Sequence, residues 1–275
     1  MELVLRRSAL PMLLLLALAQ PAGAAPSAKL WDKWTARDDG SVREVDHSVW
    51  DAFLIDYVRT DANGINRIPY ASVSDADQRA LADYLAALKG VAVSELNRPE
   101  QLAYWINLYN ALTVKVVLDH YPVSSIRDIK SGFFSIGPWR KKRVQVQAEQ
   151  LSLDDIEHRI LRPIWRDPRI HYAVNCAALG CPNLQAKAFT ASAAERMLEK
   201  AAREFINHPR AVTFENGELV VSSIFEWFKE DFGDGDQDVI KHLSRYASPE
   251  LAAKLAGVTR IDDDRYDWQL NDAEP

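Results

Sequence analysis

Residues 97–120 read NRPEQLAYWINLYNALTVKVVLDH, and this segment constrains how the rest of the chain can fold. Asn97 followed three residues later by Glu100 is the pattern of a helix N-cap with a reciprocal glutamate, so we predict a helix from here to about His120. Beyond the cap, leucine, isoleucine, valine, tyrosine and tryptophan occupy every side of the predicted helix. Because a helix that is apolar all round is buried in a core, the segment predicts a central helix.

Two asparagines lie inside this predicted core helix. Asn107 and Asn110 place amides among apolar neighbours, where an amide without hydrogen bonds costs about 1–3 kcal/mol. Both therefore need partners. They either hold the backbone of a neighbouring loop or line a site, where they could assist in binding an oxyanion. Together with Lys115 they favour a core helix over a membrane span.

The second informative segment is residues 169–183, RIHYAVNCAALGCPN, which holds both cysteines of the chain. Side chains alternate along its first half, which predicts a short strand with His171 and Asn175 on one face. A thiol beside an imidazole and an amide suits nucleophilic catalysis, since the base increases the thiolate fraction and the amide orients the base or binds an oxyanion. This interpretation makes Cys176 or Cys181 the nucleophile and His171 the base.

The alternative for this segment is structural. A disulfide between Cys176 and Cys181 would close a small loop in an oxidising compartment, and His171 would be a buried, hydrogen-bonded residue. The residue types alone favour this alternative, because an exported chain with only two cysteines usually pairs them. Cys-x4-Cys without a second pair or a His-Glu-x-x-His motif leaves few recognisable metal ligands, so we expect no metal and no cofactor.

A glutamate interrupts the apolar stripe of the helix that precedes this segment. Ser152 is predicted to cap that helix, and Ile156 and Ile160 mark its inward face. Glu157 lies within the stripe, so its carboxylate must be paired or protonated. It could orient His171, which is the third role in a catalytic triad, or it could form a structural pair with an arginine.

The remaining patterns predict the fold class. Residues 31–58 look helical with a break at Asp38-Asp39-Gly40, and a β-hairpin is expected over 212–221 around Asn216-Gly217. Further helices are predicted at 74–88, 192–207, 238–246 and 249–255, and Ser192 and Ser223 begin capping-box patterns. We therefore expect an α+β fold, a predominantly helical single domain with a central buried helix and a small antiparallel sheet that includes the 212–221 hairpin.

Residues 131–140 form a loop rich in glycine and aromatic side chains, which is typical of one wall of a ligand cleft. Trp139 in this loop is therefore a candidate substrate-binding residue, together with Asn107, Asn110 and Asn175.

Residues 1–25 have the pattern of a secretory signal peptide, with Arg6 and Arg7 before an apolar run and small residues at 22–24. We expect this segment to be removed, which would leave one globular domain over residues 26–275 in the periplasm or outside the cell, with no integral membrane span. A net charge of −6 argues against nucleic acid as a partner. The expected partner is a small molecule or a peptide.

Several of these motifs together resemble the DUF547 family, a domain of unknown function. The motifs that carry the resemblance are Trp105-Ile-Asn107-Leu-Tyr109-Asn110, Leu151-Ser-Leu-Asp-Asp-Ile-Glu157-His158-Arg-Ile-Leu161-Arg162, His171-Tyr-Ala-Val-Asn175-Cys176-Ala-Ala-Leu-Gly180-Cys181-Pro182, Asp231-Phe232 and Tyr266-Asp-Trp268-Gln-Leu-Asn271. The resemblance implies a single domain of mixed α and β structure and no established activity. It also suggests that Asn110, Glu157, His171 and the two cysteines form one polar cluster, for which papain-like thiol enzymes are an analogy only.

Two hypotheses of function follow. The first is a thiol-dependent hydrolase or acyl transferase acting on a peptide or amide, with Cys176 or Cys181, His171 and Glu157 as catalytic residues. The second is a non-catalytic envelope module, in which a Cys176–Cys181 disulfide and the buried polar network maintain the fold around a binding groove. Thiol redox chemistry is a weaker third hypothesis, because the cysteine spacing is not Cys-x-x-Cys.

Overall fold

The computed structural model of the protein describes residues 26–130, 132 and 136–273. The predicted signal peptide, residues 1–25, lies outside the described residues, as do positions 131 and 133–135 of the predicted aromatic loop. The boundaries of a single domain over residues 26–275 remain a prediction.

The predicted central helix is α3, Arg98–Leu118, and it is the core of one half of the molecule. Every residue from Glu100 to Leu118 is buried except Lys115. The Asn97 side chain accepts a hydrogen bond from the Glu100 amide at 3.0 Å, which confirms the cap. The reciprocal bond is not made, because the Glu100 carboxylate accepts from the Val45 amide instead, at 2.7 Å.

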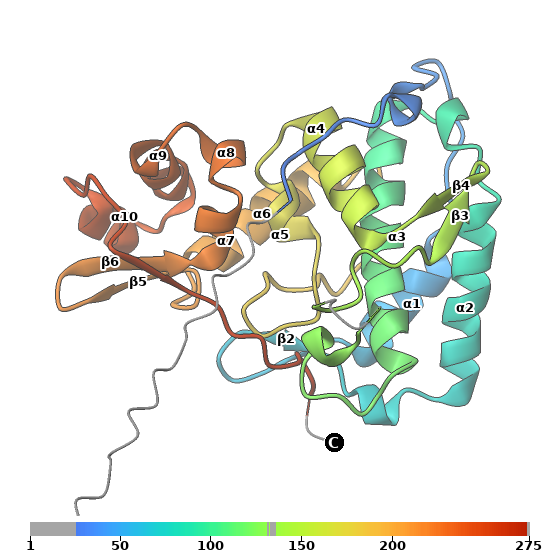
Figure 1. The fold of residues 1–275 in the computed structure, drawn as a ribbon, viewed down its shortest axis with the longest axis horizontal. Helices are drawn as coiled ribbons and strands as arrows, with labels where there is room; N and C mark the ends of the chain where they lie inside the picture. The colour runs from blue at the N-terminus through green and yellow to red at the C-terminus, as the bar shows by residue number, and fades with distance from the viewer. Residues whose placement is uncertain (1–25, 131, 133–135, 274–275) are drawn as a thin grey trace, which may run out of the picture.

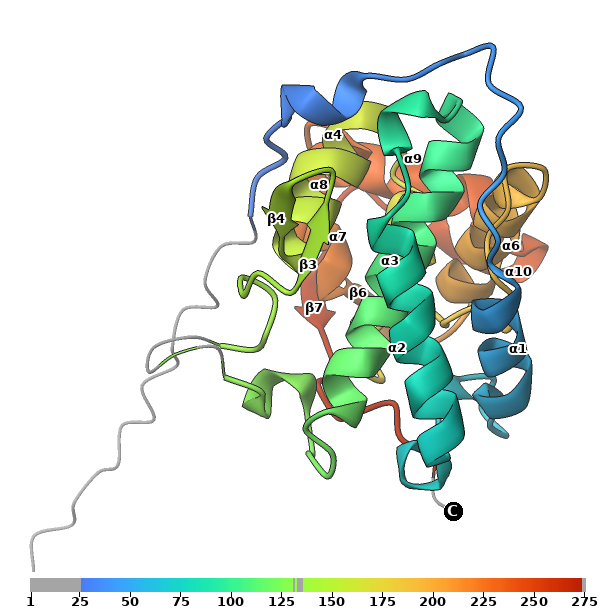
Figure 2. The same cartoon turned by 90° about the vertical axis from the view of Figure 1, so that its right-hand side faces the viewer.

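The helix α2 (Asp75–Lys89) lies beside α3 in both views of the fold, and α1 (Ser48–Tyr57) packs against α2 (Figures 1 and 2). Ser74 is the N-cap of α2. The segment from Ala36 to His47 is not helical, contrary to the prediction for residues 31–58; only a 3-10 turn, η1 at Asp32–Thr35, precedes it. Hydrogen bonds join its backbone to the residues just before α3. The Asp38 amide donates to the Leu96 carbonyl, and the Asn97 side chain donates to the Ser41 carbonyl. Those tertiary bonds replace the ones a helix would make.

A second group of elements packs around its own apolar cluster, which includes Phe205, Phe225 and Leu243. Its helices are α6 (Ala194–Ile206), α7 (Ser223–Trp227), α8 (Lys229–Phe232), α9 (Asp236–Tyr246) and α10 (Pro249–Leu255). Figure 1 shows α7 to α10 at the opposite side of the molecule from α1 to α3. Two predicted caps are wrong: the Thr190 carbonyl, not the Ser192 side chain, accepts from the first amides of α6, and Ser222 rather than Ser223 caps α7.

In the part of the chain that the structure describes, the strands form three small sheets. They pair β1 (Arg59–Thr60) with β2 (Asn66–Arg67), β3 (Val144–Val146) with β4 (Glu149–Leu151), and β5 (Val212–Glu215) with β6 (Glu218–Ser222) and β7 (Asp263–Arg265). The β5–β6 hairpin is the predicted one, and Asn216 and Gly217 have φ of 52° and 87°, as a type I′ turn requires. β7 adds to β6 in parallel, which local patterns could not predict. The α+β class with a predominantly helical fold is confirmed.

The strand predicted at the start of residues 169–183 is wrong. Residues Ile170–Ala173 form a short helix, α5, and the extended chain begins only at Val174. The Asn110 side chain of α3 donates to the Ala173 carbonyl and accepts from the Asn175 amide, both at 2.8 Å. Because α3 and the turn itself satisfy this backbone, no partner strand is needed, and His171 and Asn175 do not share a strand face.

Candidate functional site

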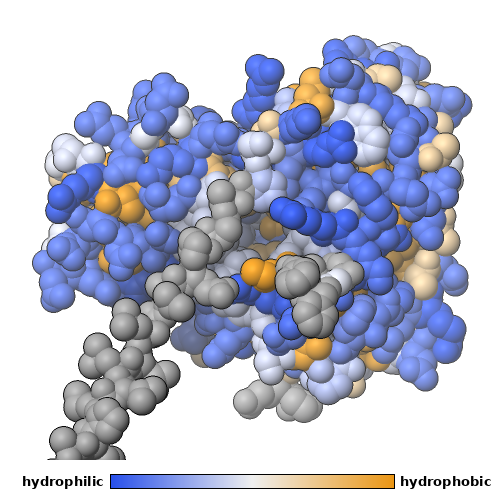
Figure 3. Space-filling view, viewed as in Figure 1, coloured by the Kyte–Doolittle hydropathy of each residue, from blue (hydrophilic) through white to orange (hydrophobic). Residues whose placement is uncertain are grey.

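A pocket of about 340 Å³ lies where the two groups of elements meet. Figure 3 shows the hollowed middle of this face of the molecule. The pocket is lined by side chains from several helices and from the loops between them. They include Tyr109, Arg127, Trp139, Asp154, Glu157, His158, His171, Cys176, Cys181, Trp227, Phe228, Tyr266 and Trp268. The pocket therefore combines titratable groups with a large aromatic surface, as small-molecule sites commonly do.

Glu157 and His158 lie in a π-helical segment, η5 (Asp155–Leu161), which directly follows Asp154 and continues into α4 (Arg162–Trp165). π-helical turns are rare and frequently occur at functional sites. Pro163 has no N–H, so the His158 carbonyl lacks the donor that the π register would supply. The Lys29 amide donates to that carbonyl at 2.9 Å. This hydrogen bond holds the N-terminal segment against η5 beside the pocket.

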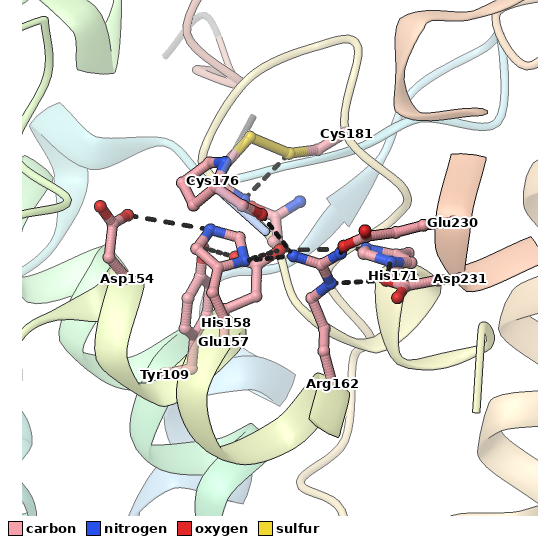
Figure 4. Close-up of polar contacts among 12 residues, drawn as sticks. Tyr109, Asp154, Glu157, His158, Arg162, His171, Cys176, Cys181, Glu230 and Asp231 are labelled. Atoms are coloured by element: carbon pink, nitrogen blue, oxygen red, sulfur yellow. Dashed lines mark hydrogen bonds and ion pairs between the residues drawn. A yellow bond between two sulfur atoms is a disulfide. The ribbon is translucent and has the colours of Figure 1, made fainter. Parts of the chain in front are cut away.

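Glu157 is bonded to a tyrosine and faces two histidines (Figure 4). Tyr109 Oη donates to Glu157 Oε2 at 2.8 Å. The other oxygen, Oε1, lies 3.9 Å from His171 Nδ1 and 4.0 Å from His158 Nδ1. The structure thus brings Glu157 and His171 together, as the catalytic hypothesis requires, and it places tyrosine rather than arginine against the carboxylate.

The residue that orients His171 is Asp231 of α8. His171 Nε2 donates to Asp231 Oδ2 at 2.6 Å, and Phe228 stacks on the imidazole with ring centroids 4.4 Å apart. Arg162 donates to the same carboxylate. Burial raises the pKa of Asp231, but the hydrogen bonds from His171 and Arg162 outweigh it and lower that pKa to about 2. Asp231 is therefore ionised, and His171 Nδ1 is left facing Glu157.

The tautomer of His158 follows from its neighbour. Arg162 is a donor only, and it lies 3.1 Å from His158 Nδ1. His158 Nδ1 must accept this bond, so the imidazole is neutral and carries its proton on Nε2. Burial lowers the pKa of His158, which agrees with the neutral form. The Nε2–H lies on the side of Asp154, whose Oδ1 is 3.9 Å away.

Asp154 has a raised pKa, which is relevant to acid–base chemistry in the pocket. Burial raises its pKa to about 6, and the neighbouring Glu157 carboxylate adds to the effect. Arg140 Nε, 3.6 Å from Asp154 Oδ2, opposes this shift. An aspartate with a pKa of about 6 exchanges protons close to neutral pH, which is a property of catalytic acids.

The two cysteines form a disulfide with Cα atoms 6.2 Å apart, which confirms the predicted pairing. Tyr266 Oη lies 3.0 Å from both sulfurs, and the Cys176 amide donates to the Cys181 sulfur at 2.9 Å. Both cysteines line the pocket, but as a disulfide neither sulfur is a thiolate.

The three candidate asparagines lie outside the pocket lining and are bonded to backbone. Asn107 donates to the Phe189 carbonyl and accepts from the Phe189 amide. Asn110 holds the turn between Ala173 and Asn175 as described above. Asn175 donates to the Pro182 carbonyl at 2.8 Å and accepts from the Ala177 amide, and so it shapes the disulfide loop. These contacts match the alternative in which the asparagines hold neighbouring loops.

Trp139 lines the pocket and belongs to a cluster of rings, while its role in binding a substrate stays a prediction. Trp227 and Trp268 are stacked with centroids 5.5 Å apart, Tyr266 lies 4.6 Å from Trp268, and Trp139 meets Trp268 edge-on at 5.8 Å. The pocket therefore has an aromatic wall, made by Trp139, Trp227, Tyr266 and Trp268. Within the described ranges no group of three or more histidines, cysteines, aspartates or glutamates has the geometry of a metal site.

Reasoning from sequence missed Asp154, Tyr109 and Asp231. Asp154 lies three residues before Glu157, so a search for a second carboxylate on the same side of that helix would have found it. Asp231 and Tyr109 come from distant elements, and the only signal for them was their presence in the motifs that carry the family resemblance.

The fold and the site together define an α+β protein with a histidine–carboxylate pocket beside a disulfide. Residues 93–206 match the model of the family DUF547, described as a protein of unknown function, so the resemblance is confirmed for this segment of the chain. No curated protein and no solved structure shows significant similarity to the chain. Asp231 and the aromatic residues Trp227, Tyr266 and Trp268 lie beyond the matched segment. None of the helices in the described part of the chain is long and apolar enough to cross a membrane.

Proposed function

We propose that the pocket is the active site of a hydrolase that cleaves a small amide or peptide substrate by acid–base catalysis. The observation that carries this proposal is the convergence of Asp154, Glu157, His158 and His171 on one aromatic-walled pocket. Two carboxylates with different environments and an oriented imidazole are the groups that proton transfer at neutral pH requires.

Each group has a role that fits its contacts. Glu157, next to His171, accepts a proton from a water molecule as that water attacks the substrate carbonyl carbon. His158 Nε2–H donates a hydrogen bond to the oxyanion that forms. Asp154 then gives its proton to the leaving amine as the carbon–nitrogen bond breaks, and proton exchange with solvent restores both carboxyl groups. Asp231 is a positioning residue, because it holds His171 without facing the pocket.

The disulfide supports water rather than a cysteine thiolate as the nucleophile. A thiol-dependent reaction would need Cys176–Cys181 to be reduced first. The two routes respond in opposite ways to a reductant: the acid–base route persists without one, and the thiol route requires one.

The experiment is to incubate the protein with a mixture of short peptides of varied sequence, with and without a reductant, and to identify cleaved products by mass spectrometry. We expect cleavage without reductant, and a loss of at least about 100-fold in Asp154→Asn and Glu157→Gln. The matched control is Glu149→Gln, an acid on β4 that pairs with Lys33 outside the pocket, and it should be unaffected. Cleavage only after reduction would refute the acid–base route.

The second candidate is a binding module without catalysis. The disulfide and the aromatic wall favour it, since both shape a pocket without requiring a reaction. A ligand that binds the pocket while no peptide, amide or ester in the panel is cleaved would establish this candidate and refute the first.

We also propose that the protein is exported to the periplasm or secreted. The signal-like pattern of residues 1–25 supports this, and so does the disulfide, because disulfides persist in oxidising compartments. Amino-terminal sequencing of the protein from fractionated cells would test it; an intact amino terminus in the cytoplasmic fraction would refute it.

A further inference from the structure

The pocket has a cationic end that the proposed reaction does not use. Arg127, from the 3-10 turn η4 (Ile126–Asp128), lines the pocket and is half-buried. Its guanidinium lies 5.0 Å from the ring centroid of Trp268, which keeps it against the aromatic wall.

The other arginines near the pocket are already paired. Arg140 lies 3.6 Å from the Asp154 carboxylate, and Arg162 is bonded to Asp231 and Glu230 beneath His171. In the part of the chain that the structure describes, no carboxylate lies within ion-pair distance of Arg127. Among the described residues that line the pocket, Arg127 is therefore an arginine whose charge an anionic ligand could neutralise without displacing a carboxylate.

The aromatic wall connects this cation to the acid–base groups. The Arg127 guanidinium lies over the Trp268 ring. Trp227 stacks on Trp268, and Trp139 contacts it edge-on. The Trp139 carbonyl accepts from the Asp154 amide at 3.1 Å, so the wall continues directly into the segment that bears the catalytic carboxyl groups. A ligand lying along the wall would reach from Arg127 towards Asp154 and Glu157.

We infer that Arg127 binds a carboxylate of the substrate while a flat apolar part of that substrate lies against Trp227 and Trp268. The inference rests on the proposed function, to which it adds the substrate class. The orientation of the substrate is set by charge: the ionised Glu157 repels a second carboxylate, and the planar guanidinium of Arg127 matches the geometry of a carboxylate. The carboxyl end of a peptide with an aromatic last residue and an acidic sugar joined through an amide both have this chemistry.

Binding of four small probes, measured by calorimetry, tests the inference without any turnover. N-acetylphenylalanine is compared with its amide, and methyl glucuronide with methyl glucoside, so that the members of each pair differ only at the carboxylate position and the two pairs distinguish the two sources. A charge-assisted contact should make at least one acid bind roughly tenfold more tightly than its neutral partner. Arg127→Gln should abolish that preference, and Arg127→Lys should restore only part of it.

The matched control is Arg159→Gln. Arg159 also lies on a tryptophan, 4.2 Å from the centroid of Trp31, but it does not line the pocket, so the preference for the acid should persist in this variant. Equal binding of acid and neutral partner, no binding of either acid, or a preference that survives Arg127→Gln would overturn the inference. None of these results bears on peptide cleavage, so the proposed hydrolase would fail or stand separately.

Discussion

At the scale of single residues, the ionised Asp154 side chain destabilises the folded protein, and its proposed catalytic role explains why it is there. Its pKa is raised from an ordinary value near 4 to about 6 by burial and by Glu157, so the folded protein holds a proton that the unfolded chain releases. Folding stability therefore falls as the pH rises from about 4 to 6, and the full penalty is present above pH 6. Functional sites commonly retain such unfavourable groups.

We predict that Asp154→Asn stabilises the protein at pH 7 by up to about 3 kcal/mol and changes its stability little at pH 4. The neutral amide needs no desolvation of a charge, and this is the physical reason. Urea denaturation at the two pH values measures the effect, with Asp128→Asn, an exposed acid outside the pocket, as the control. A loss of stability at pH 7 would contradict the buried-carboxylate interpretation.

At the scale of elements, α3 positions the disulfide loop through one amide. Asn110→Ala leaves the Ala173 carbonyl and the Asn175 amide without their buried partner, so we expect a loss of roughly 2–4 kcal/mol. Thr113→Val on the same helix is a matched control, because the buried Thr113 hydroxyl has no hydrogen-bond partner among the described residues. Thermal unfolding should show a lower Tm for Asn110→Ala alone; equal Tm values would mean that the amide does not hold the loop.

The C-terminal segment is attached to the disulfide loop at Gly180. The Gly180 amide donates to the Asp267 carbonyl at 2.8 Å, and a Cβ at this glycine would lie 2.8 Å from the Asp267 nitrogen. Gly180→Ala should therefore push away the segment that carries Tyr266 and Trp268, at a cost of about 1–3 kcal/mol. Limited proteolysis should cut that segment faster, whereas Gly235→Ala, where a Cβ meets nothing within 4 Å, should not change the cleavage rate.

At the scale of the whole molecule, buried neutral histidines make the fold sensitive to acid. Burial lowers the pKa of His47 and of His242 to about 4, and it also lowers the pKa of His158. The unfolded chain binds protons at these positions below about pH 6.5 while the folded protein does not, so stability is lost as the pH falls from 6.5 to 4. Protonation of Asp154 in the same range offsets part of that loss.

We predict that the free energy of unfolding, measured by urea titration at pH 7, 6 and 5, falls at each step towards acid. His47→Gln should flatten the profile, because it removes a group that contributes up to about 3 kcal/mol of this dependence, whereas Asp154→Asn should make it steeper. Parallel profiles for His47→Gln and the wild-type protein would show that His47 does not contribute.

Local patterns in the sequence determined the elements whose signals lie within a few residues. The apolar run and Asn97 determined α3, and Asn216-Gly217 determined the β5–β6 hairpin, because capping and turn chemistry act between near neighbours. The pairing of Cys176 with Cys181 was also predictable, since the two lie five residues apart in a chain with no other cysteine.

Tertiary structure alone decided the site. The 170–175 segment alternates like a strand, yet α3 satisfies its backbone and it forms α5 instead. His171 is oriented by Asp231, sixty residues away, and Glu157 by Tyr109, forty-eight residues away, and periodicity carries no information about contacts across such separations. The raised pKa of Asp154 likewise depends on burial by segments remote in sequence, because desolvation is a property of the folded surroundings and not of the residue.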